Sequence, residues 1–250
     1  MERAALLGRL RAPLPWRVAT VRDVVEETAR ARTLVLDVPG WPGHAAGQHV
    51  DVRLTAEDGY QAERSYSIAS APEDERLALT VERIDDGEVS PYLTEELRAR
   101  DGLELRGPVG GHFTWRVQDG GPLLLVAGGS GLVPLMAMLR HRAAAASAVE
   151  TRLLVSARRG DDVLYRDELA RLDGVAAHYT LTREAPDGWT GYARRVDAAM
   201  LAEIGPAPAE RPHVFVCGPT AFVERAADEL VELGHSPRAI RAERFGPTGG

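Results

Sequence analysis

The chain has 250 residues, of which 44% are hydrophobic and 27% charged, and its formal net charge is −7. This length exceeds that of most single domains, so we expect two compact domains with the composition of a globular protein, not of a disordered or fibrous one. The negative charge disfavours nucleic acid as a partner, and the longest apolar run, residues 123–127, is too short to cross a bilayer, so we expect a cytoplasmic protein that binds neither nucleic acid nor membrane.

The cysteine and lysine counts limit the kinds of binding and redox site that these residues can form. The single cysteine, Cys217, excludes an internal disulfide, a zinc site made of cysteines and an iron–sulfur cluster held by four thiolates. We therefore predict no metal site and expect an organic cofactor to carry any electrons that the protein transfers. All 30 basic residues are arginine. A codon bias explains this, yet every cationic contact is then made by a planar, permanently charged group suited to phosphate.

The first part of the chain reads as short strands separated by turns, which is typical of a small antiparallel β-barrel. The stretch RSYSIAS, at 64–70, places a permanent cation in one of these strands. Residues 1–12 resemble a loose amphipathic helix, and residues 90–102 a helical insert, for which Ser90 is a suitable N-cap before Pro91. The predicted strands are 16–27, 33–38, 49–55, 63–70, 77–84 and 103–110.

After residue 118 apolar strands alternate with helical patterns, which indicates a parallel sheet covered by helices on both faces, a nucleotide-binding type of α/β fold. We therefore divide the chain into an antiparallel β-barrel domain at 1–118 and an α/β domain at 119–250. The predicted strands are 123–127, 151–157, 175–182, 213–218 and 238–245, and the predicted helices are 132–147, 165–173, 196–204 and 221–234.

The first strand of the second part runs into a glycine-rich turn, AGGSGLVPL at 127–135. Glycines at such a turn let a pyrophosphate approach the backbone, and the helix that follows offers unpaired amides. Because Pro134 stands where the common dinucleotide motif has its third glycine, after Gly129 and Gly131, the motif is incomplete. A purely structural tight turn stays open as the alternative.

Arginines follow the ends of successive predicted strands. Parallel strands deliver their carboxyl ends to one edge of the sheet, so these side chains would converge there, and an arginine at this edge accommodates the extra phosphate of NADP. The set favours NADPH over NADH, although solvated loop arginines are the alternative. The residues are Ser156, Arg158 and Arg159, then Thr182 and Arg183, then Arg194 and Arg195.

Six motifs in order resemble the ferredoxin-NADP reductase superfamily, in particular its stand-alone bacterial FAD-dependent members without an iron–sulfur domain. They cover about residues 17–246: RSYSIAS, GEVSPYL, GPVGGHF, GGSGLVPL, CGPTAF and ERFG. The resemblance implies that Arg64 pairs with the pyrophosphate of FAD, that Tyr66 lies along the flavin ring and that Ser67 bonds near its hydride-accepting nitrogen. The other implied FAD contacts are Ser65, Val81, Glu82, Gly87, Val89 and Ser90.

The resemblance also implies the residues around the nicotinamide. Ser67, Cys217 and Glu243 would surround the point of hydride transfer, with Ser130 and the segment Gly218–Pro219 contacting the dinucleotide. The aromatic residue near the C-terminus is Phe245 where plant-type relatives end at a tyrosine, and five residues follow it. Whether Phe245 stacks on the flavin or leaves the nicotinamide site open is undecided from the sequence.

The function implied by the resemblance is hydride transfer from NADPH to bound FAD, followed by single-electron transfer to a separate ferredoxin or flavodoxin-like protein that serves an oxygenase. Two alternatives stay open. One is an NAD(P)H:flavin reductase that uses free flavin as substrate, and the other is a non-catalytic flavin-binding subunit that relays electrons in a larger complex. FMN in place of FAD and NADH in place of NADPH are also open.

Overall fold

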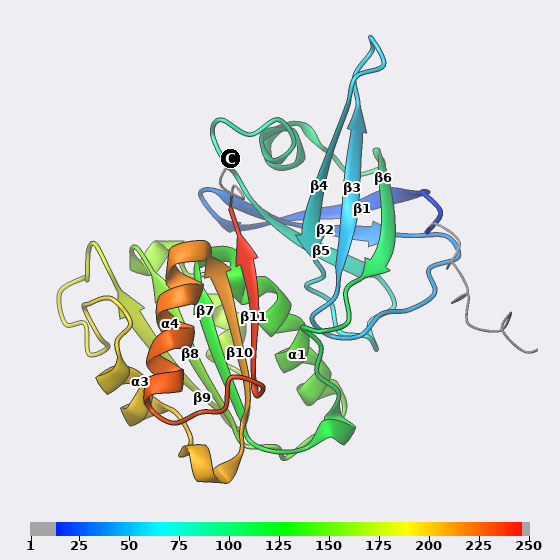
Figure 1. The fold of residues 1–250 in the computed structure, drawn as a ribbon. Helices are drawn as coiled ribbons and strands as arrows, with labels where there is room; N and C mark the ends of the chain where they lie inside the picture. The colour runs from blue at the N-terminus through cyan, green and yellow to red at the C-terminus, as the bar shows by residue number, and fades with distance from the viewer. Residues whose placement is uncertain (1–13, 247–250) are drawn as a thin grey trace, which may run out of the picture.

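The computed structural model describes residues 14–246 as two lobes, each built on one β-sheet (Figure 1). We call residues 17–109 the barrel lobe and residues 123–245 the sheet lobe. The helix predicted for residues 1–12 lies outside the described residues. The connection between the lobes contains a short 3₁₀ turn, η2 (Val117–Asp119), in which the predicted domain boundary falls.

The barrel lobe is all antiparallel. Its strands are β1 (Arg17–Thr28), β2 (Ala31–Asp37), β3 (His49–Thr55), β4 (Gln61–Ser67), β5 (Leu77–Glu82) and β6 (Gly102–Val109). They form one sheet in the order β4-β3-β6-β1-β2-β5. A single antiparallel bridge between Ile68 and Leu79 brings the two edges of this sheet together. Closing the sheet removes exposed strand edges, and the predicted antiparallel barrel is confirmed.

The helical insert is shorter than the sequence predicts. Instead of a helix over 90–102, the structure has a π-helical turn, η1 (Tyr92–Glu96). The chain leaves the helix at Leu97, and the backbone amide of Arg98 donates to the Asp101 carboxylate at 2.7 Å, which closes a turn in place of further helix. The Ser90 hydroxyl does not cap the turn but accepts the amide of Ile84 at 3.0 Å.

The sheet lobe holds a parallel sheet in the order β11-β10-β7-β8-β9, so the predicted α/β fold is confirmed. Its strands are β7 (Leu123–Gly128), β8 (Thr151–Ala157), β9 (Val175–Leu181), β10 (His213–Pro219) and β11 (Ile240–Phe245). Its helices are α1 (Leu132–Ala144), α2 (Arg166–Leu169), α3 (Ala198–Ile204) and α4 (Thr220–Glu232), and its 3₁₀ turns are η3 (Gly129–Gly131), η4 (Gly160–Asp162) and η5 (Pro208–Glu210).

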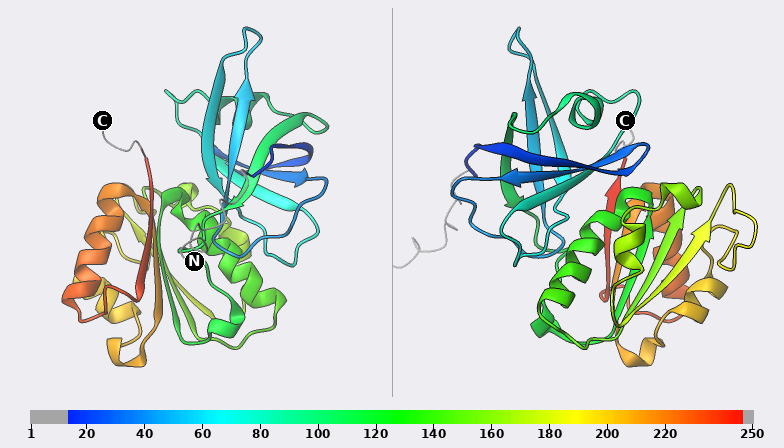
Figure 2. Two further views of the ribbon diagram at one scale, coloured as in Figure 1. Left: turned by 45° about the vertical axis from the view of Figure 1, so that its right-hand side comes forward. Right: turned by 180° about the vertical axis from the view of Figure 1, so that it is seen from behind.

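Helices cover both faces of the parallel sheet, with α1 on one side and α3 and α4 on the other (Figure 2). Alternate residues of one strand therefore enter different cores: Leu125 packs with α1, whereas Leu124 and Val126 pack with α3 and α4. Both sets are fully buried, which explains why these strands read as continuous apolar runs.

The two lobes share one buried cluster. Ala46 and Ala69 of the barrel lobe and Trp115 of the connection pack with α1 and β7 in the same core. The carboxyl end of β11 points toward the barrel lobe (Figure 1). The strand ends that were predicted to carry the site therefore meet the barrel lobe across a packed junction. No described helix has the length and apolar character of a bilayer span.

Candidate functional site at the junction of the two lobes

The carboxyl ends of the parallel strands align functional side chains in one row. Strand pairing sets Glu243 of β11 beside Cys217 of β10, and Cys217 beside Ala127 of β7. Farther along, Ser156 of β8 lies next to Gly128 of β7. The sheet-lobe candidates predicted from the sequence therefore lie at one rim, as parallel topology requires.

The glycine turn after β7 lies directly against β10. A β-carbon on Gly131 would come within 2.1 Å of the Cys217 carbonyl oxygen, so only glycine fits there. Gly129 adopts a φ of +55° and Gly218 a φ of +153°, and Pro134 lies in the first turn of α1. The close packing of η3 against β10 is by itself a sufficient reason for glycine at this turn. The same turn leaves backbone amides at the rim, where Ser130 is half-buried.

Cys217, which is fully buried, and Glu243, whose side chain is 22% exposed, are neighbouring ionisable groups. Burial raises the pKa of the Cys217 thiol well above its usual value, and the nearby Glu243 carboxylate raises it further, so the thiol stays protonated at neutral pH. Burial also raises the pKa of Glu243 to about 7. Within the described residues, Glu243 Oε2 is buried and has no hydrogen-bond partner.

The barrel lobe meets this pair through His49, a residue that the sequence analysis missed. His49 Nδ1 lies 3.7 Å from Glu243 Oε1, and His49 pairs with Ser67 across β3 and β4. Ser67 is 6% exposed, and its Oγ finds no partner in the described part of the chain. The structure thus sets His49 beside Ser67 in the barrel sheet and beside Glu243 across the junction, and burial lowers the pKa of the His49 imidazole. The hairpin register was the only sequence signal for His49.

Arg64 lies in the middle of β4, three residues before Ser67 at its end. Its Nη2 donates to Glu88 Oε2 at 2.9 Å and its Nη1 to the Glu63 carbonyl at 2.7 Å. Glu88 belongs to the segment 87–90, in which Gly87, Val89 and Ser90 were predicted as FAD contacts but Glu88 was not. The structure therefore brings the arginine and this segment together, and both side chains are about half exposed.

Strand alternation separates the residues of RSYSIAS. Arg64 and Tyr66 share the face of β4 that packs toward the barrel core, and burial raises the pKa of Tyr66 to about 12. Ser65 lies on the opposite face, where its hydroxyl donates to Asp51 Oδ1 at 2.7 Å. The Ser65 side chain is therefore not brought together with Arg64 and Tyr66, and only its backbone can take part in a site with them.

Two valines predicted as contacts face the barrel core instead. Val81 and Val89 are at most 1% exposed and pack within the apolar cluster of this lobe, so only their backbone groups can reach a ligand. Glu82, next to Val81, is exposed and points toward the glycine turn, since its Oε2 lies 3.9 Å from where a β-carbon on Gly129 would stand.

Gly87 and Ser90 form a tight bend before η1. A β-carbon on Gly87 would lie 3.0 Å from both the Ile84 carbonyl oxygen and Ser90 Oγ, so the bend needs glycine. Because Ser90 Oγ accepts a hydrogen bond from the Ile84 amide, the proton of the hydroxyl remains available to a ligand.

The arginines at the far end of the rim differ in whether a carboxylate pairs with them. The backbone amide of Arg183 donates to the Arg158 carbonyl at 3.0 Å, which brings these two residues together. Arg159 pairs with Glu184 at 3.0 Å, and Arg194 with Asp197 at 2.7 Å. Among the residues that the structure describes, no carboxylate oxygen lies within 4.0 Å of the nitrogens of three exposed arginines: Arg158, Arg183 and Arg195. Thr182 is exposed beside them.

Phe245 ends β11 beside Pro219 and is half-buried. Its ring packs against the core that contains Cys217, so one aromatic edge borders the row formed by Cys217 and Glu243. Pro219 is exposed at the end of β10.

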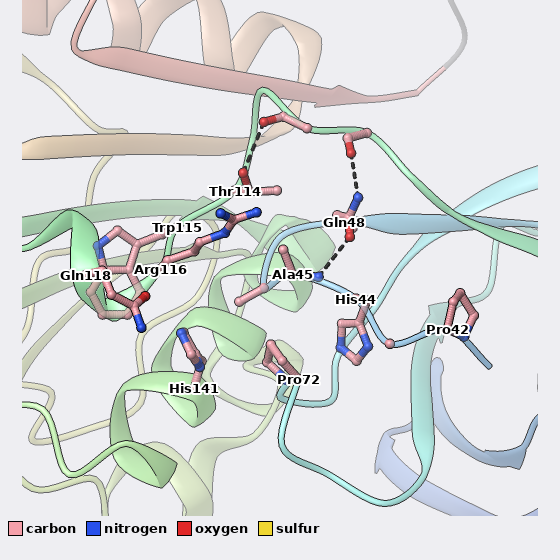
Figure 3. A pocket seen from close by; sticks show the side chains of 14 residues that line it. Pro42, His44, Ala45, Gln48, Pro72, Thr114, Trp115, Arg116, Gln118 and His141 are labelled. Carbon is pink, nitrogen blue, oxygen red and sulfur yellow. Dashed lines mark hydrogen bonds between the residues drawn. The ribbon is translucent and has the colours of Figure 1, made fainter. Parts of the chain in front are cut away.

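A separate hollow of about 630 Å³ opens between the lobes near α1 (Figure 3). Part of its polar lining is paired: the Gln48 amide accepts from Ala45 N and donates to the Gly110 carbonyl, and His141 Nδ1 lies 2.7 Å from Glu73. Trp115 Nε1, which also belongs to this lining, is buried without a hydrogen-bond partner among the described residues. Neither Ser67 nor Glu243 lines this hollow. Across residues 14–246 we find no cluster of three or more His, Cys, Asp or Glu side chains suited to a metal ion.

Comparison with known proteins identifies both lobes. Residues 18–115 match the oxidoreductase FAD-binding domain and residues 125–228 the oxidoreductase NAD-binding domain. The chain is 37% identical over 212 residues to ferredoxin-NADP reductase B of Sorangium cellulosum (strain So ce56), which covers 80% of this chain and 84% of that protein. It also resembles the crystal structure of an Amycolatopsis cytochrome P450 reductase, with a TM-score of 0.82, 29% identity and coverage of 97% of this chain and 73% of the other.

A further relative is longer than this chain. The glycine betaine monooxygenase reductase subunit of Pseudomonas aeruginosa (strain UCBPP-PA14) is 31% identical over 233 residues, which are 90% of this chain and 63% of that subunit. The chain therefore spans less than two thirds of the length of this relative.

Proposed function

The chain belongs to the ferredoxin-NADP reductase superfamily, and from this membership and the geometry of the junction we propose that it is a flavoprotein oxidoreductase. In this proposal it transfers a hydride from NADPH to bound FAD and passes single electrons to a separate ferredoxin or flavodoxin-like protein. The 250 residues contain one cysteine, so they cannot themselves hold a cluster by four thiolates. The names of two relatives, a ferredoxin-NADP reductase and a monooxygenase reductase subunit, support an acceptor that serves an oxygenase.

The observation that carries this proposal is a pair of buried polar atoms without partners. Ser67 Oγ from the barrel lobe and Glu243 Oε2 from the sheet lobe are two of three such atoms among the described residues. Leaving a buried polar group unpaired costs about 1–3 kcal/mol, so native proteins rarely do so without a ligand or water. Both atoms belong to the site around His49, where a flavin ring with its nitrogens and carbonyls would supply partners. The residues present therefore fit the cofactor.

Arg64 and Ser90 would hold the pyrophosphate of FAD. The guanidinium offers charge-assisted, bidentate bonds to phosphate oxygens, and the Ser90 hydroxyl keeps a proton to donate. The backbone amides around Gly87 and Val89 would complete this phosphate site. Tyr66 lies on the same face of β4 as Arg64, and Ser67 on the opposite face at the end of the strand, so a flavin ring that contacts both would lie across the end of β4. We assign the adenylate half to the backbone at Val81 and to Glu82.

When bound, FAD supplies the redox chemistry, accepting two electrons as a hydride and releasing them singly. The protein positions the reactants and controls protons at the junction. With a pKa near 7, Glu243 Oε2 can hold or release a proton at neutral pH, and neutral His49 lies 3.7 Å away. Cys217 remains a neutral thiol, so it shapes the transfer point without competing as a nucleophile.

The rim of the sheet lobe would bind the nicotinamide coenzyme. Gly129, Ser130 and Gly131 present backbone amides to its pyrophosphate, and Gly218 and Pro219 border the nicotinamide next to Phe245. Ser156, Thr182 and the exposed arginines Arg158, Arg183 and Arg195 lie where a ribose phosphate would reach, which supports NADPH over NADH.

The test is an absorption spectrum of the purified protein with FAD, before and after anaerobic addition of NADPH. Wild type should keep a flavin spectrum through gel filtration, and NADPH should bleach it. Arg64→Ala should weaken FAD binding at least about tenfold, because a charge-assisted bond to phosphate is lost. Arg53→Ala is the matched control, since Arg53 lies on the outer face of β3 and pairs with Glu104.

The outcomes separate the alternatives. Protein that loses flavin on gel filtration but reduces added flavin with NADPH would be a flavin reductase, and bound flavin that NADPH cannot bleach would indicate a relay subunit. A chain that binds no flavin at all would refute the proposal, and an Arg64→Ala variant that keeps its flavin would remove the assigned role of Arg64.

A further inference from the structure

Arg64 already has an anion beside it. Its Nη2 donates to Glu88 Oε2 at 2.9 Å, and the second carboxylate oxygen of Glu88 accepts the Tyr60 hydroxyl at 3.1 Å. The two partners come from different segments: Tyr60 precedes β4, and Glu88 lies between β5 and η1. The carboxylate is therefore held in place at the one arginine that we assign to the cofactor's phosphates.

Glu88 also stands within the phosphate site itself. It lies between Gly87 and Ser90, whose backbone and hydroxyl we assign to the same pyrophosphate. A carboxylate and a phosphate ester both accept hydrogen bonds from the same guanidinium nitrogens. Arg64 Nη1 already donates to the Glu63 carbonyl at 2.7 Å. A bidentate contact with phosphate through both terminal nitrogens requires Arg64 to change partners.

We propose that Glu88 is an affinity-setting residue: its carboxylate competes with the cofactor's phosphates for Arg64 and so weakens the retention of FAD. This inference rests on the proposed flavin function and concerns how tightly the cofactor is held, not whether the site exists. It applies to any flavin that carries a phosphate, FAD or FMN, and not to riboflavin, which has none. Tyr60 acts as a positioning residue for the carboxylate.

The expected size of the effect is modest. Arg64 and Glu88 are each 52% exposed, and an ion pair of this kind shifts an equilibrium by about fivefold at most. Repulsion between the carboxylate and the phosphates adds to the competition, and salt screens both contributions, since the Debye length is only about 3 Å at 1 M. We therefore expect a change of about three- to fivefold at low salt that fades at high salt.

The experiment compares wild type with Glu88→Gln, each as flavin-free full chain. Dissociation constants for FAD, FMN and riboflavin are measured by flavin fluorescence at about 0.05 M and 1 M salt. At low salt Glu88→Gln should bind FAD and FMN about three- to fivefold more tightly than wild type, with no change for riboflavin. At 1 M salt the variant and wild type should converge.

Glu63→Gln is the matched control. It removes the same charge from the residue next to Arg64, but the Glu63 side chain lies on the opposite face of β4 and pairs with Arg106 at 3.3 Å. Its FAD affinity should stay close to that of wild type. Tyr60→Phe, which releases Glu88 without removing its charge, should tighten FAD less than Glu88→Gln does.

Four results would overturn the inference. Unchanged or weaker FAD binding by Glu88→Gln, while Arg64→Ala loses FAD, would refute the competition and leave the flavin function standing. Equal tightening of riboflavin would mean that Glu88 acts on the ring and not on the phosphates. If Glu63→Gln tightened FAD binding as much as Glu88→Gln does, the effect would come from the net charge of the protein and not from competition at Arg64. No flavin binding by wild type would refute both this inference and the proposed function.

Discussion

Glu243 gives the site a pH dependence that can be measured without cofactor. Burial raises its pKa to about 7 in the folded chain, above its ordinary value of 4.5. The folded state therefore holds a proton that the unfolded state releases, so stability falls as pH rises from about 4.5 to 7. Glu243→Gln removes this cost. The advantage of the variant over wild type in unfolding free energy should therefore be roughly 3 kcal/mol larger at pH 8 than at pH 4.5.

The measurement is urea unfolding of the flavin-free protein, with the difference in unfolding free energy between Glu243→Gln and wild type followed from pH 4.5 to 8. Burial lowers the pKa of His49, which is present in both proteins, so only its coupling to Glu243 enters the difference. A difference that stays flat across this range would contradict the buried, unpartnered state of Glu243.

Single residues mark the limit of what this sequence could predict. Arg64, Cys217 and Glu243 were singled out because motifs carried them, whereas His49 and Glu88 were missed. His49 reaches Glu243 only after the barrel lobe docks on the sheet lobe, and no pattern within one strand records that contact. Glu88 lay inside a quoted motif, but its pairing with Arg64 depends on how the loop after β5 bends.

At the scale of elements the sequence was more informative. All eleven strands were predicted close to their observed bounds, because alternating patterns in the barrel and buried apolar runs in the parallel sheet follow directly from which faces are covered. The helix predicted for 90–102 was wrong in length, and α2 is also shorter than predicted. The segment 90–102 combines good helix formers with a short side-chain-to-backbone turn, the bond from the Arg98 amide to Asp101, which local propensity does not reveal.

We expect the loops after β8 and β9 to set the coenzyme preference. We expect Arg158→Ala and Arg183→Ala each to raise the KM for NADPH roughly tenfold and the KM for NADH much less, since each removes a charged partner of the ribose phosphate alone. The measurement is steady-state reduction of a dye or ferricyanide with each coenzyme. Equal increases for both coenzymes would contradict the NADPH preference.

Arg194→Ala is the control within the same rim. Arg194 is already paired with Asp197, which caps α3, and lies over the Tyr192 ring at 5.0 Å. Its replacement should lower stability by about 1 kcal/mol or less without changing the ratio of the two KM values. A selective loss of NADPH binding in this variant would instead show that Asp197 gives up its arginine to the coenzyme.

Across the whole molecule, the site requires the two lobes to keep a fixed orientation. Ser67 and His49 come from one lobe, and Cys217 and Glu243 from the other. Polar contacts cross the junction beside them: the Tyr165 hydroxyl bonds to Thr80 Oγ1, and Arg140 donates to the Ala69 carbonyl at 2.7 Å. Sequence patterns predicted each lobe but not these contacts, because they join residues 71 or more positions apart.

Arg140 reaches across the junction, and we expect the orientation of the lobes to depend on it. From α1 its guanidinium reaches Ala69 in the barrel lobe, pairs with Glu168 of α2 at 2.6 Å and lies over the Tyr165 ring at 4.9 Å. Arg140→Met keeps the apolar stem but removes the bond to Ala69, which should destabilise the protein by about 2 kcal/mol and weaken the coupling between the lobes. In calorimetry the unfolding of the two lobes should then separate into two transitions.

Arg152→Met distinguishes this coupling from a general loss of stability. Arg152 also donates to two carbonyl oxygens, those of Ile204 and Gly205, but both acceptors lie within the sheet lobe. This variant should lower the melting temperature to a similar degree, yet the sheet lobe should still unfold in step with the barrel lobe, as we expect of wild type. If Arg140→Met and Arg152→Met gave the same transition shape, the lobes would be coupled by the shared apolar core around Ala46 and Trp115 and not by the polar contacts that cross it.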